Sequence, residues 1–261
     1  MTMDFVHAFQ AEWLKRRRSL ASWLVVAGSL FTPAIIIVAR LVRHEQLQQI
    51  YSASDFWRRL WNNSWESMAI FFLPMGAILA TSLITQIEFK NNGWKQVHSL
   101  PLSLATIYFS KLAVIVLMVV QFFVLFNVAI YGSAVIPYAL VSGVPYPPGP
   151  LPLSKFLEDD LLFLVDCLPI VGAQYLMSVR FRNFLVPVGI GFLAWVGALG
   201  ALRWEFGYLF PYTYCMLNYL KDNPDSKAAI PAMNIHWLAI GYFAFFTLIG
   251  FILFATKKEK G

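Results

Sequence analysis

Six long apolar stretches constrain the fold of this chain more than any other feature. Each is long enough for an α-helix of roughly 20 residues, the length needed to cross the hydrocarbon core of a bilayer. Hydrophobic residues make up 59% of the 261 residues, and charged residues only 13%, which is well below the share usual in soluble domains. We therefore predict an all-α membrane protein with six transmembrane helices, at residues 20–41, 65–86, 107–131, 160–179, 183–203 and 235–256.

Prolines and glycines inside these stretches predict how the helices bend and pack. A proline removes one backbone N–H, and in lipid the freed carbonyl is usually satisfied by a neighbouring helix. We expect such kinks at Pro33, Pro74, Pro169 and Pro187. Small residues on a helix surface permit close approach of another helix, and the fifth stretch has Gly189, Gly191, Gly197 and Gly200.

Residues 1–18 combine apolar and charged side chains. Phe5, Phe9, Trp13 and Leu14 recur at helical spacing, a pattern typical of an amphipathic helix that lies in the membrane interface. A basic run, 15–18, follows directly before the first span and indicates a topology signal; the alternatives are lipid or nucleic-acid binding. Because the formal net charge of +6 sits beside apolar stretches, we expect anionic lipid and no nucleic acid as the partner.

The distribution of Lys and Arg predicts that both termini lie in the cytoplasm. With the N-terminus inside, the inside segments hold a clear excess of Lys and Arg over acids, and the outside segments do not. This asymmetry follows the positive-inside rule and predicts a multi-pass protein of the cell membrane. Arg58 and Arg59 weaken the asymmetry because they fall in the first outside loop.

Each of the three outside segments has its own character. Residues 42–64 are partly apolar, and either extend the first span or form a surface helix. Residues 141–155 hold five prolines and two glycines, which predicts a stiff, extended connector. Residues 204–234 contain the stretch EFGYLFPYTYCMLNYL, which is too short to span and too aromatic for a solvated loop, so we predict a re-entrant or interfacial hairpin before the last span.

The segment between the second and third spans, 87–106, is polar and lies inside in this topology. Asn92 and Gly93 tolerate positive φ and favour a turn, and Pro101 suits the start of a new helix. The segment is therefore predicted to form short helices around a turn. It is either a simple connector or a docking surface.

The sequence lacks the common motifs of catalysis. It has no Gly-x-Ser-x-Gly, no His-Glu-x-x-His and no phosphate-binding loop, so it cannot hydrolyse ATP by the usual route. The four histidines are scattered, and the two cysteines have no metal-site or disulfide spacing. We expect no enzymatic activity, no cofactor and no metal.

A few polar residues fall within the predicted spans. Asp166 lies roughly 20 Å from the cytoplasmic face, at about 1.5 Å per helical residue. Such a carboxylate usually faces a bundle interior or water, so Asp166 either lines a substrate path or is a helix-end group reached from outside. Gln121, Asn127 and Gln174 are candidates for the same path or for hydrogen bonds between helices.

The whole layout resembles a type-2 ABC (ABC-2) exporter permease, and in particular the permeases of lantibiotic- and bacteriocin-immunity and peptide-antibiotic exporters. The resemblance covers nearly the full chain. In such permeases a Glu, a Gly turn, a Pro and a Lys mark the cytoplasmic coupling loop, and here Glu88, Gly93, Pro101 and Lys111 stand at those places. The stretches that carry the resemblance are FQAEWLKRRRS before the first span, EFKNNGWKQ at 88–96 and SLPLSLATIYFSK at 99–111.

The resemblance implies a single permease domain, 1–261, without its own ATPase. Two permease subunits, identical or paralogous, would form the translocation path and dock two separate ABC ATP-binding subunits. The substrate would be a peptide antibiotic or another amphiphile. The resemblance places the ATPase contact at Glu88, Phe89, Asn92, Gly93, Trp94 and Lys95. The alternatives are an intramembrane enzyme and a membrane anchor or sensor subunit without a transport path.

Overall fold

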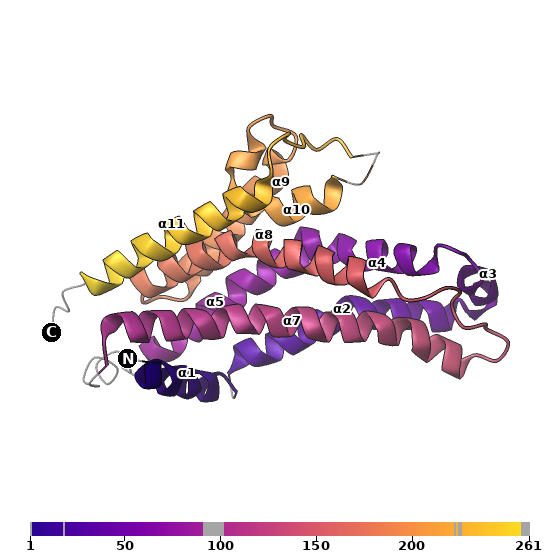
Figure 1. Ribbon diagram of the computed structural model, residues 1–261, viewed down its shortest axis with the longest axis horizontal. Helices are drawn as coiled ribbons and strands as arrows, with labels where there is room; N and C mark the ends of the chain where they lie inside the picture. The colour runs from indigo at the N-terminus through magenta and orange to yellow at the C-terminus, as the bar shows by residue number, and fades with distance from the viewer. Residues whose placement is uncertain (1, 18, 91–101, 222, 224–225, 257–261) are drawn as a thin grey trace.

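Helices are the only regular elements in the computed structural model, which describes residues 2–17, 19–90, 102–221, 223 and 226–256 (Figure 1). The prediction of an all-α fold is therefore confirmed for these residues. The longer helices are α1 (Thr2–Arg16), α2 (Leu20–Val42), α4 (Phe56–Ser67), α5 (Leu73–Lys90), α7 (Leu104–Leu140), α8 (Leu153–Arg180), α9 (Leu185–Ala201) and α11 (Ile235–Ala255). The shorter ones are η1 (His44–Gln46), α3 (Leu47–Tyr51), η2 (Met68–Phe72), η3 (Gly207–Leu209), η4 (Pro211–Thr213) and α10 (Tyr214–Leu220).

Five of the described helices are long and apolar enough to cross a membrane. They are α2, the continuous helix Phe56–Phe89, α7, α8 and α11. The fifth predicted span, 183–203, folds as α9, which has 17 residues and is about 25 Å long at 1.5 Å per residue. A sixth crossing is thus not confirmed and stays a prediction.

Residues 42–64, which we predict outside, do not extend the first span, which ends at Val42. They begin with the short helices η1 and α3, most of whose residues are exposed, as in the alternative of a surface helix. The remainder includes most of α4, which runs through the π-helical turn η2 into α5 and so extends the second span. One face of α4 is buried: the rings of Trp61 and Phe156 stack with centroids 3.9 Å apart, as do those of Trp65 and Phe163.

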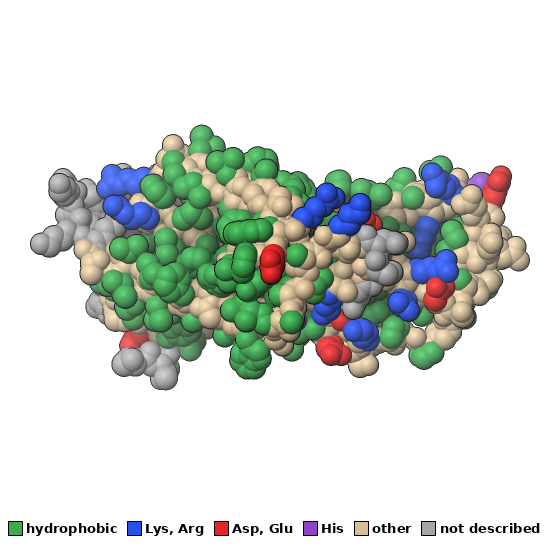
Figure 2. Space-filling model, turned by 90° about the horizontal axis from the view of Figure 1, so that it is seen from above, with side chains coloured by type: hydrophobic (Ala, Val, Ile, Leu, Met, Phe, Trp, Pro, Cys, Tyr) green, Lys and Arg blue, Asp and Glu red, His purple; other side chains and the backbone are tan. Residues whose placement is uncertain are grey.

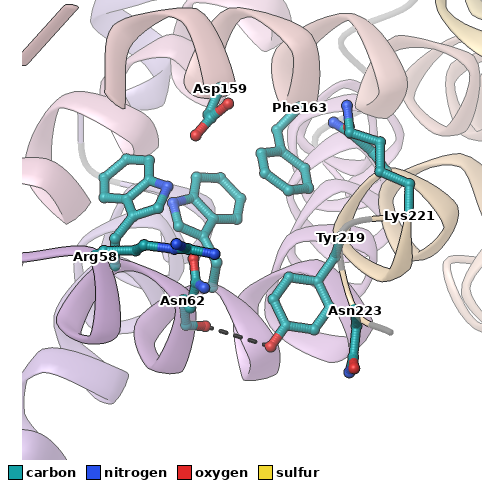
Figure 3. Close-up of a pocket in the computed structure, with 10 residues that line it drawn as sticks. Arg58, Asn62, Asp159, Phe163, Tyr219, Lys221 and Asn223 are labelled. Carbon is teal, nitrogen blue, oxygen red and sulfur yellow. Dashed lines mark hydrogen bonds between the residues drawn. The ribbon is translucent and has the colours of Figure 1, made fainter. Parts of the chain in front are cut away.

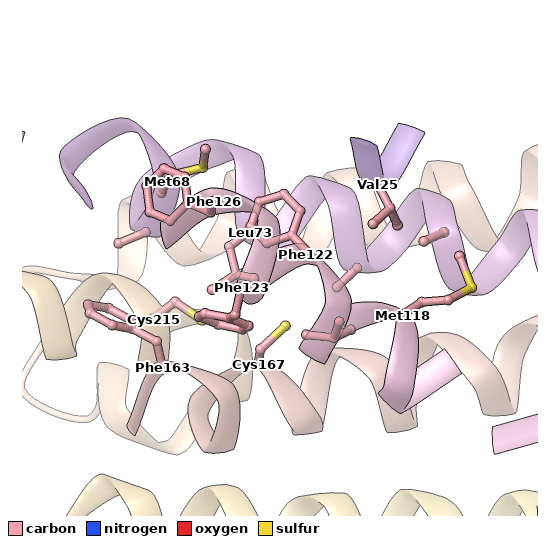
Figure 4. Close-up of a cluster of buried hydrophobic side chains, with 14 of the residues drawn as sticks. Val25, Met68, Leu73, Met118, Phe122, Phe123, Phe126, Phe163, Cys167 and Cys215 are labelled. Carbon is pink, nitrogen blue, oxygen red and sulfur yellow. The ribbon is translucent and has the colours of Figure 1, made fainter. Parts of the chain in front are cut away.

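The helices pack as pairs around a large apolar core, and a second, smaller cluster joins α10 to α11. Helix α7, of 37 residues, packs against α2, while α8 packs against α11 and α5 (Figure 1). Side chains from α2, η2, α5, α7, α8 and α10 meet between these pairs, among them Val25, Met68, Leu73, Phe122, Phe126, Phe163 and Cys215 (Figure 4). This burial fixes the positions of the polar groups that project from the same helices.

Two backbone carbonyls that lie four residues before a proline accept hydrogen bonds from side chains of neighbouring helices. In α-helical register Pro74 leaves the carbonyl of Ile70 without its N–H, and the indole N–H of Trp195 on α9 donates to it at 2.8 Å. Pro137, in a part of α7 beyond the predicted span, leaves the carbonyl of Ser133, which accepts from Arg40 Nη1 on α2 at 2.8 Å. The expectation of satisfied carbonyls is confirmed at Pro74.

The glycines of α9 behave unequally. A Cβ on Gly191 would lie 2.6 Å from Gln174 Oε1 of α8 and 2.9 Å from Ile78 of α5, whereas one on Gly189 would meet nothing within 4 Å. The predicted close approach is therefore made at one position, where α9 packs against α5 and α8.

The two remaining segments that we predict outside, 141–155 and 204–234, each contain a long non-helical stretch among their described residues. No helix is formed between Val141 and Pro152, in agreement with the prolines there. In 204–234, the described residues from Tyr212 to Asn218 are buried, and they pack against α8, α9 and α11. That this hairpin re-enters the bilayer, and that α1 lies in the interface, stay predictions.

The surface carries a broad apolar area. On the face shown in Figure 2, apolar side chains gather over the left half, and charged side chains lie mainly on the right half and at the left tip. Helices α9 and α11 contribute many exposed large apolar residues to the surface, including Leu185, Phe192, Leu193, Trp237, Phe245 and Leu248. Such a surface suits contact with lipid or with another apolar subunit.

Candidate functional site

The end of α5, the first turns of α7 and the helix α1 meet at one end of the molecule, near the last turn of α11 (Figure 1). Helices α5 and α7 are the two that flank the predicted coupling segment. Four charged side chains join the three helices at this point: Glu12 and Lys15 from α1, Glu88 from α5 and Lys111 from α7. We refer to them as the charge cluster.

Each lysine of the charge cluster bridges both carboxylates. Lys15 Nζ lies 2.7 Å from Glu12 Oε1 and 2.8 Å from Glu88 Oε1. Lys111 Nζ lies 3.1 Å from Glu88 Oε1 and also donates to Glu12 Oε2. The two positive and two negative charges alternate, so each helix is tied to the other two.

Because Glu88 and Lys111 are buried, their charges need the ion pairs of the charge cluster. The side chains of Lys111 and Glu88 are only 2% and 4% exposed, while that of Lys15 is 39% exposed. An unpaired ion in such a place would be strongly unfavourable. Burial alone would lower the pKa of Lys15, but the carboxylates of Glu12 and Glu88 raise it above the ordinary lysine value, so Lys15 is a cation at neutral pH.

A second polar contact fastens α1 to α7. The guanidinium of Arg16 donates to Gln121 on α7 and lies 3.5 Å from the ring centroid of Trp13. A cation over a tryptophan face is attracted by the ring quadrupole. Helix α1 is therefore held to α7 along more than one turn.

Of the six residues predicted to contact the ATPase, the structure describes only Glu88 and Phe89. Glu88 lies inside the chain, paired within the charge cluster, and Phe89 is half-buried. Asn92, Gly93, Trp94 and Lys95 lie outside the described residues. The predicted role of all six in ATPase contact stays a prediction, but Glu88 is oriented toward α1 and α7 in this conformation.

Sequence reasoning gave Glu12 no role, included Lys15 only in the basic topology signal, and named Lys111 only as a marker of the coupling loop; it paired none of them with Glu88. A signal was present, because Lys111 belongs to a predicted apolar helix, where a cation needs an acidic partner. Glu12 and Lys15 are also spaced by three residues, which places them on one helix face. The missing information was that α1 packs against α7, a contact between residues 99 apart in sequence.

The four predicted path residues are not brought together. Gln121 accepts from Arg16 on α1, and Asn127 donates to Asp160 of α8 at 2.7 Å. Gln174 donates to Ser82 at 2.9 Å and to the carbonyl of Pro187. These contacts connect helices, and a role for Gln121, Asn127 and Gln174 in a substrate path stays a prediction.

Asp166 is fully buried in α8 and is paired with a residue that the sequence gave no reason to choose. Its Oδ1 lies 2.7 Å from Nδ1 of His236, in the first turn of α11. The pair connects α8 to α11. Its role in a path also stays a prediction.

Two cavities open on the side of the fold where α4 lies. One, of about 270 Å³, lies among α4, α8 and α10 and is lined by Arg58, Asn62, Asp159 and Lys221, among others (Figure 3). Here Tyr219 donates to the carbonyl of Asn62. The other, of about 680 Å³, lies among α2, α3 and α4. Among the described residues, no group of three or more His, Cys, Asp or Glu could hold a metal ion.

Comparison with known proteins identifies the family. Residues 8–197, from α1 through most of α9, match the family described as ABC-2 family transporter protein. No curated protein matches the chain. The matched part includes all four residues of the charge cluster and the helices that carry them. Because the match covers well over half of the chain, this multi-pass membrane protein belongs to the ABC-2 transporter family, and is a membrane subunit of an ABC transporter.

Proposed function

We propose that the chain is the permease subunit of an ABC exporter, that it pairs with a second permease subunit, identical or paralogous, and that two separate ATP-binding subunits drive it. The family membership and the absence of a phosphate-binding loop support this proposal. The chain then has no enzymatic activity of its own. It resides in the cell membrane with both termini in the cytoplasm, as its Lys and Arg asymmetry favours.

The charge cluster is the observation that carries the proposal. Segment 91–101 connects α5 to α7, and the cluster ties the adjoining ends of both helices to α1. A subunit that pushes or pulls on this segment moves three helices as one body. ATP-driven closure requires such a stiff connection, because a flexible loop would absorb the movement before it reached the spans.

The proposed substrate is a peptide antibiotic or another amphiphile. The exposed apolar faces of α9 and α11 suit both a neighbouring permease subunit and an apolar path between subunits. These faces do not distinguish among amphiphiles. The family subgroup of lantibiotic- and bacteriocin-immunity permeases is proposed on the resemblance of the quoted stretches.

The test is co-purification with the cognate ATP-binding subunit, followed by ATPase assays in proteoliposomes. The permease should co-purify and raise the ATPase rate above that of the isolated ATP-binding subunit. Gly93→Val should weaken co-purification, whereas Lys15→Gln should leave co-purification intact and lower the stimulated rate roughly tenfold, because one shared cation of the cluster is lost.

Lys155→Gln provides the matched control for Lys15→Gln. Lys155 also forms an ion pair, with Asp159 at 3.0 Å, but this pair is within one exposed turn of α8. Its removal should not change stimulation. A chain that does not bind the ATP-binding subunit, or that binds without raising the ATPase rate, would instead be a membrane anchor or sensor.

A further inference from the structure

The predicted membrane topology does not account for the position of several arginines. They lie in segments predicted outside, where the positive-inside rule disfavours basic residues. Three of these, Arg40, Arg43 and Arg59, line the cavity of about 680 Å³ among α2, α3 and α4. We call it the arginine cavity. Its volume is within the usual range for small-molecule sites. We propose that the arginine cavity binds the phosphate headgroup of an anionic phospholipid from the membrane leaflet at this end of α2.

The charge of the arginine cavity is one-sided. No Asp or Glu is among the described residues that line it. Arg59 pairs with Asp55 on the exposed side of α4, with Nε and Oδ2 2.7 Å apart, and this hydrogen bond lowers the pKa of Asp55. Arg40 and Arg43 have no ion pair with a carboxylate of the described part of the chain. Two of the three arginines, Arg40 and Arg43, therefore lack counter-charge from the described part of the chain, and an anionic ligand supplies it.

Arg40 is held in place by neutral groups. Its Nη1 donates to the carbonyl of Ser133 at 2.8 Å and to the hydroxyl of Tyr51 at 3.2 Å. Its guanidinium also lies 5.0 Å from the ring centroid of Phe56. Both hydrogen bonds use one nitrogen, and a guanidinium has five N–H donors in a planar fork. The fold thus fixes the orientation of Arg40 and leaves donors for the two oxygens of a phosphate.

The lining is apolar as well as basic. Ile36, Ile50 and Leu60 contribute to the walls, and Ile35 and Val38 are exposed on the adjoining face of α2. Helix α2 is apolar up to Ala39 and becomes basic at Arg40 and Arg43, which places the arginine cavity at the level where headgroups meet acyl chains. A free anion would use only the arginines, whereas a phospholipid matches both the basic and the apolar lining. This match favours the lipid.

The proposal is tested on the purified full chain in neutral detergent, by native mass spectrometry with phosphatidylglycerol and with phosphatidylcholine. The wild type should retain phosphatidylglycerol and not phosphatidylcholine. Arg43→Gln with Arg59→Gln should weaken phosphatidylglycerol binding by roughly 25-fold, since each interfacial arginine contributes about fivefold. Both side chains are exposed, so the double variant should fold. Arg40 is left unchanged because it also supports α7.

Arg58→Gln is the matched control. Arg58 is the neighbour of Arg59 on α4, but it lines the other cavity, so its loss should change phosphatidylglycerol binding by less than about twofold on the same scale. Equal loss in the control, or equal retention of both lipids by the wild type, overturns the proposal. Inorganic phosphate that displaces phosphatidylglycerol at similar concentration shows a free-anion site and overturns the assignment to lipid.

Discussion

The charge cluster and the arginine cavity both contain several basic side chains, but these side chains have different surroundings. In the charge cluster two lysines meet two glutamates within the chain, and two of the four side chains are at most 4% exposed. In the arginine cavity three arginines line an open volume with no acid among the described lining residues. Cations paired with acids of other helices hold those helices together, whereas cations without an acidic partner in the described chain, here Arg40 and Arg43, indicate an external anion. Counting Lys and Arg in the sequence cannot separate the two situations.

The largest expected effect is at Glu88, which both lysines of the charge cluster share. Glu88→Gln should destabilise the chain by about 3–5 kcal/mol, because it leaves Lys111 buried with half of its counter-charge. The measurement is unfolding of the purified chain in mixed micelles. If the cluster were only a set of weak surface pairs, the loss would be less than about 1 kcal/mol, and the contrast with the arginine cavity would fail.

A double variant serves as the control for Glu88→Gln. Glu88→Leu with Lys111→Met removes one acid and one base, leaves Glu12 paired with Lys15, and fills the same space with apolar atoms. Removing both partners of a buried pair usually costs less than removing one. The double variant should therefore be more stable than Glu88→Gln.

Gly191 extends the comparison to a buried polar group without charge. Gly191→Ala would bring a Cβ to 2.6 Å from Gln174 Oε1, so α9 must shift from α8, or Gln174 must give up its hydrogen bonds to Ser82 and Pro187. We expect a loss of about 1–3 kcal/mol, typical of overpacking, in the same unfolding assay. Gly189→Ala, on the open side of α9, should cost nothing measurable; equal losses would contradict the packing argument.

The sequence predicted the parts of this fold that depend on local pattern. The apolar stretches located α2, α5, α7, α8 and α11, because an apolar run can be recognised from residues that are adjacent in the sequence. The continuation of α4 into α5 was missed because Arg58, Arg59 and Asn62 interrupt the apolar run, while the buried face of α4 is made by aromatic residues at helical spacing.

Long-range partners could not be predicted in the same way. The need for an acid near Lys111 follows from its setting, but the choice of Glu12 depends on how α1 docks. The need for a donor at the carbonyl freed by Pro74 follows from the chemistry of proline, but the choice of Trp195 depends on how α9 packs against α5. Local chemistry sets the requirement, and tertiary packing selects the residue that meets it.

The smallest effect separates two arginines that line the same cavity. Arg40→Met removes the donor to the carbonyl of Ser133 and should destabilise the chain by about 1–2 kcal/mol in neutral detergent without anionic lipid. Arg43→Met, at an exposed position, should change stability by less than about 0.5 kcal/mol under the same conditions. If the loss at Arg43 equals that at Arg40, then Arg43 supports the fold, and its lack of an internal partner cannot be taken as a sign of an external ligand. If only Arg40 matters for stability, then the fold needs Arg40, whereas the charge of Arg43 is available to the proposed anionic headgroup.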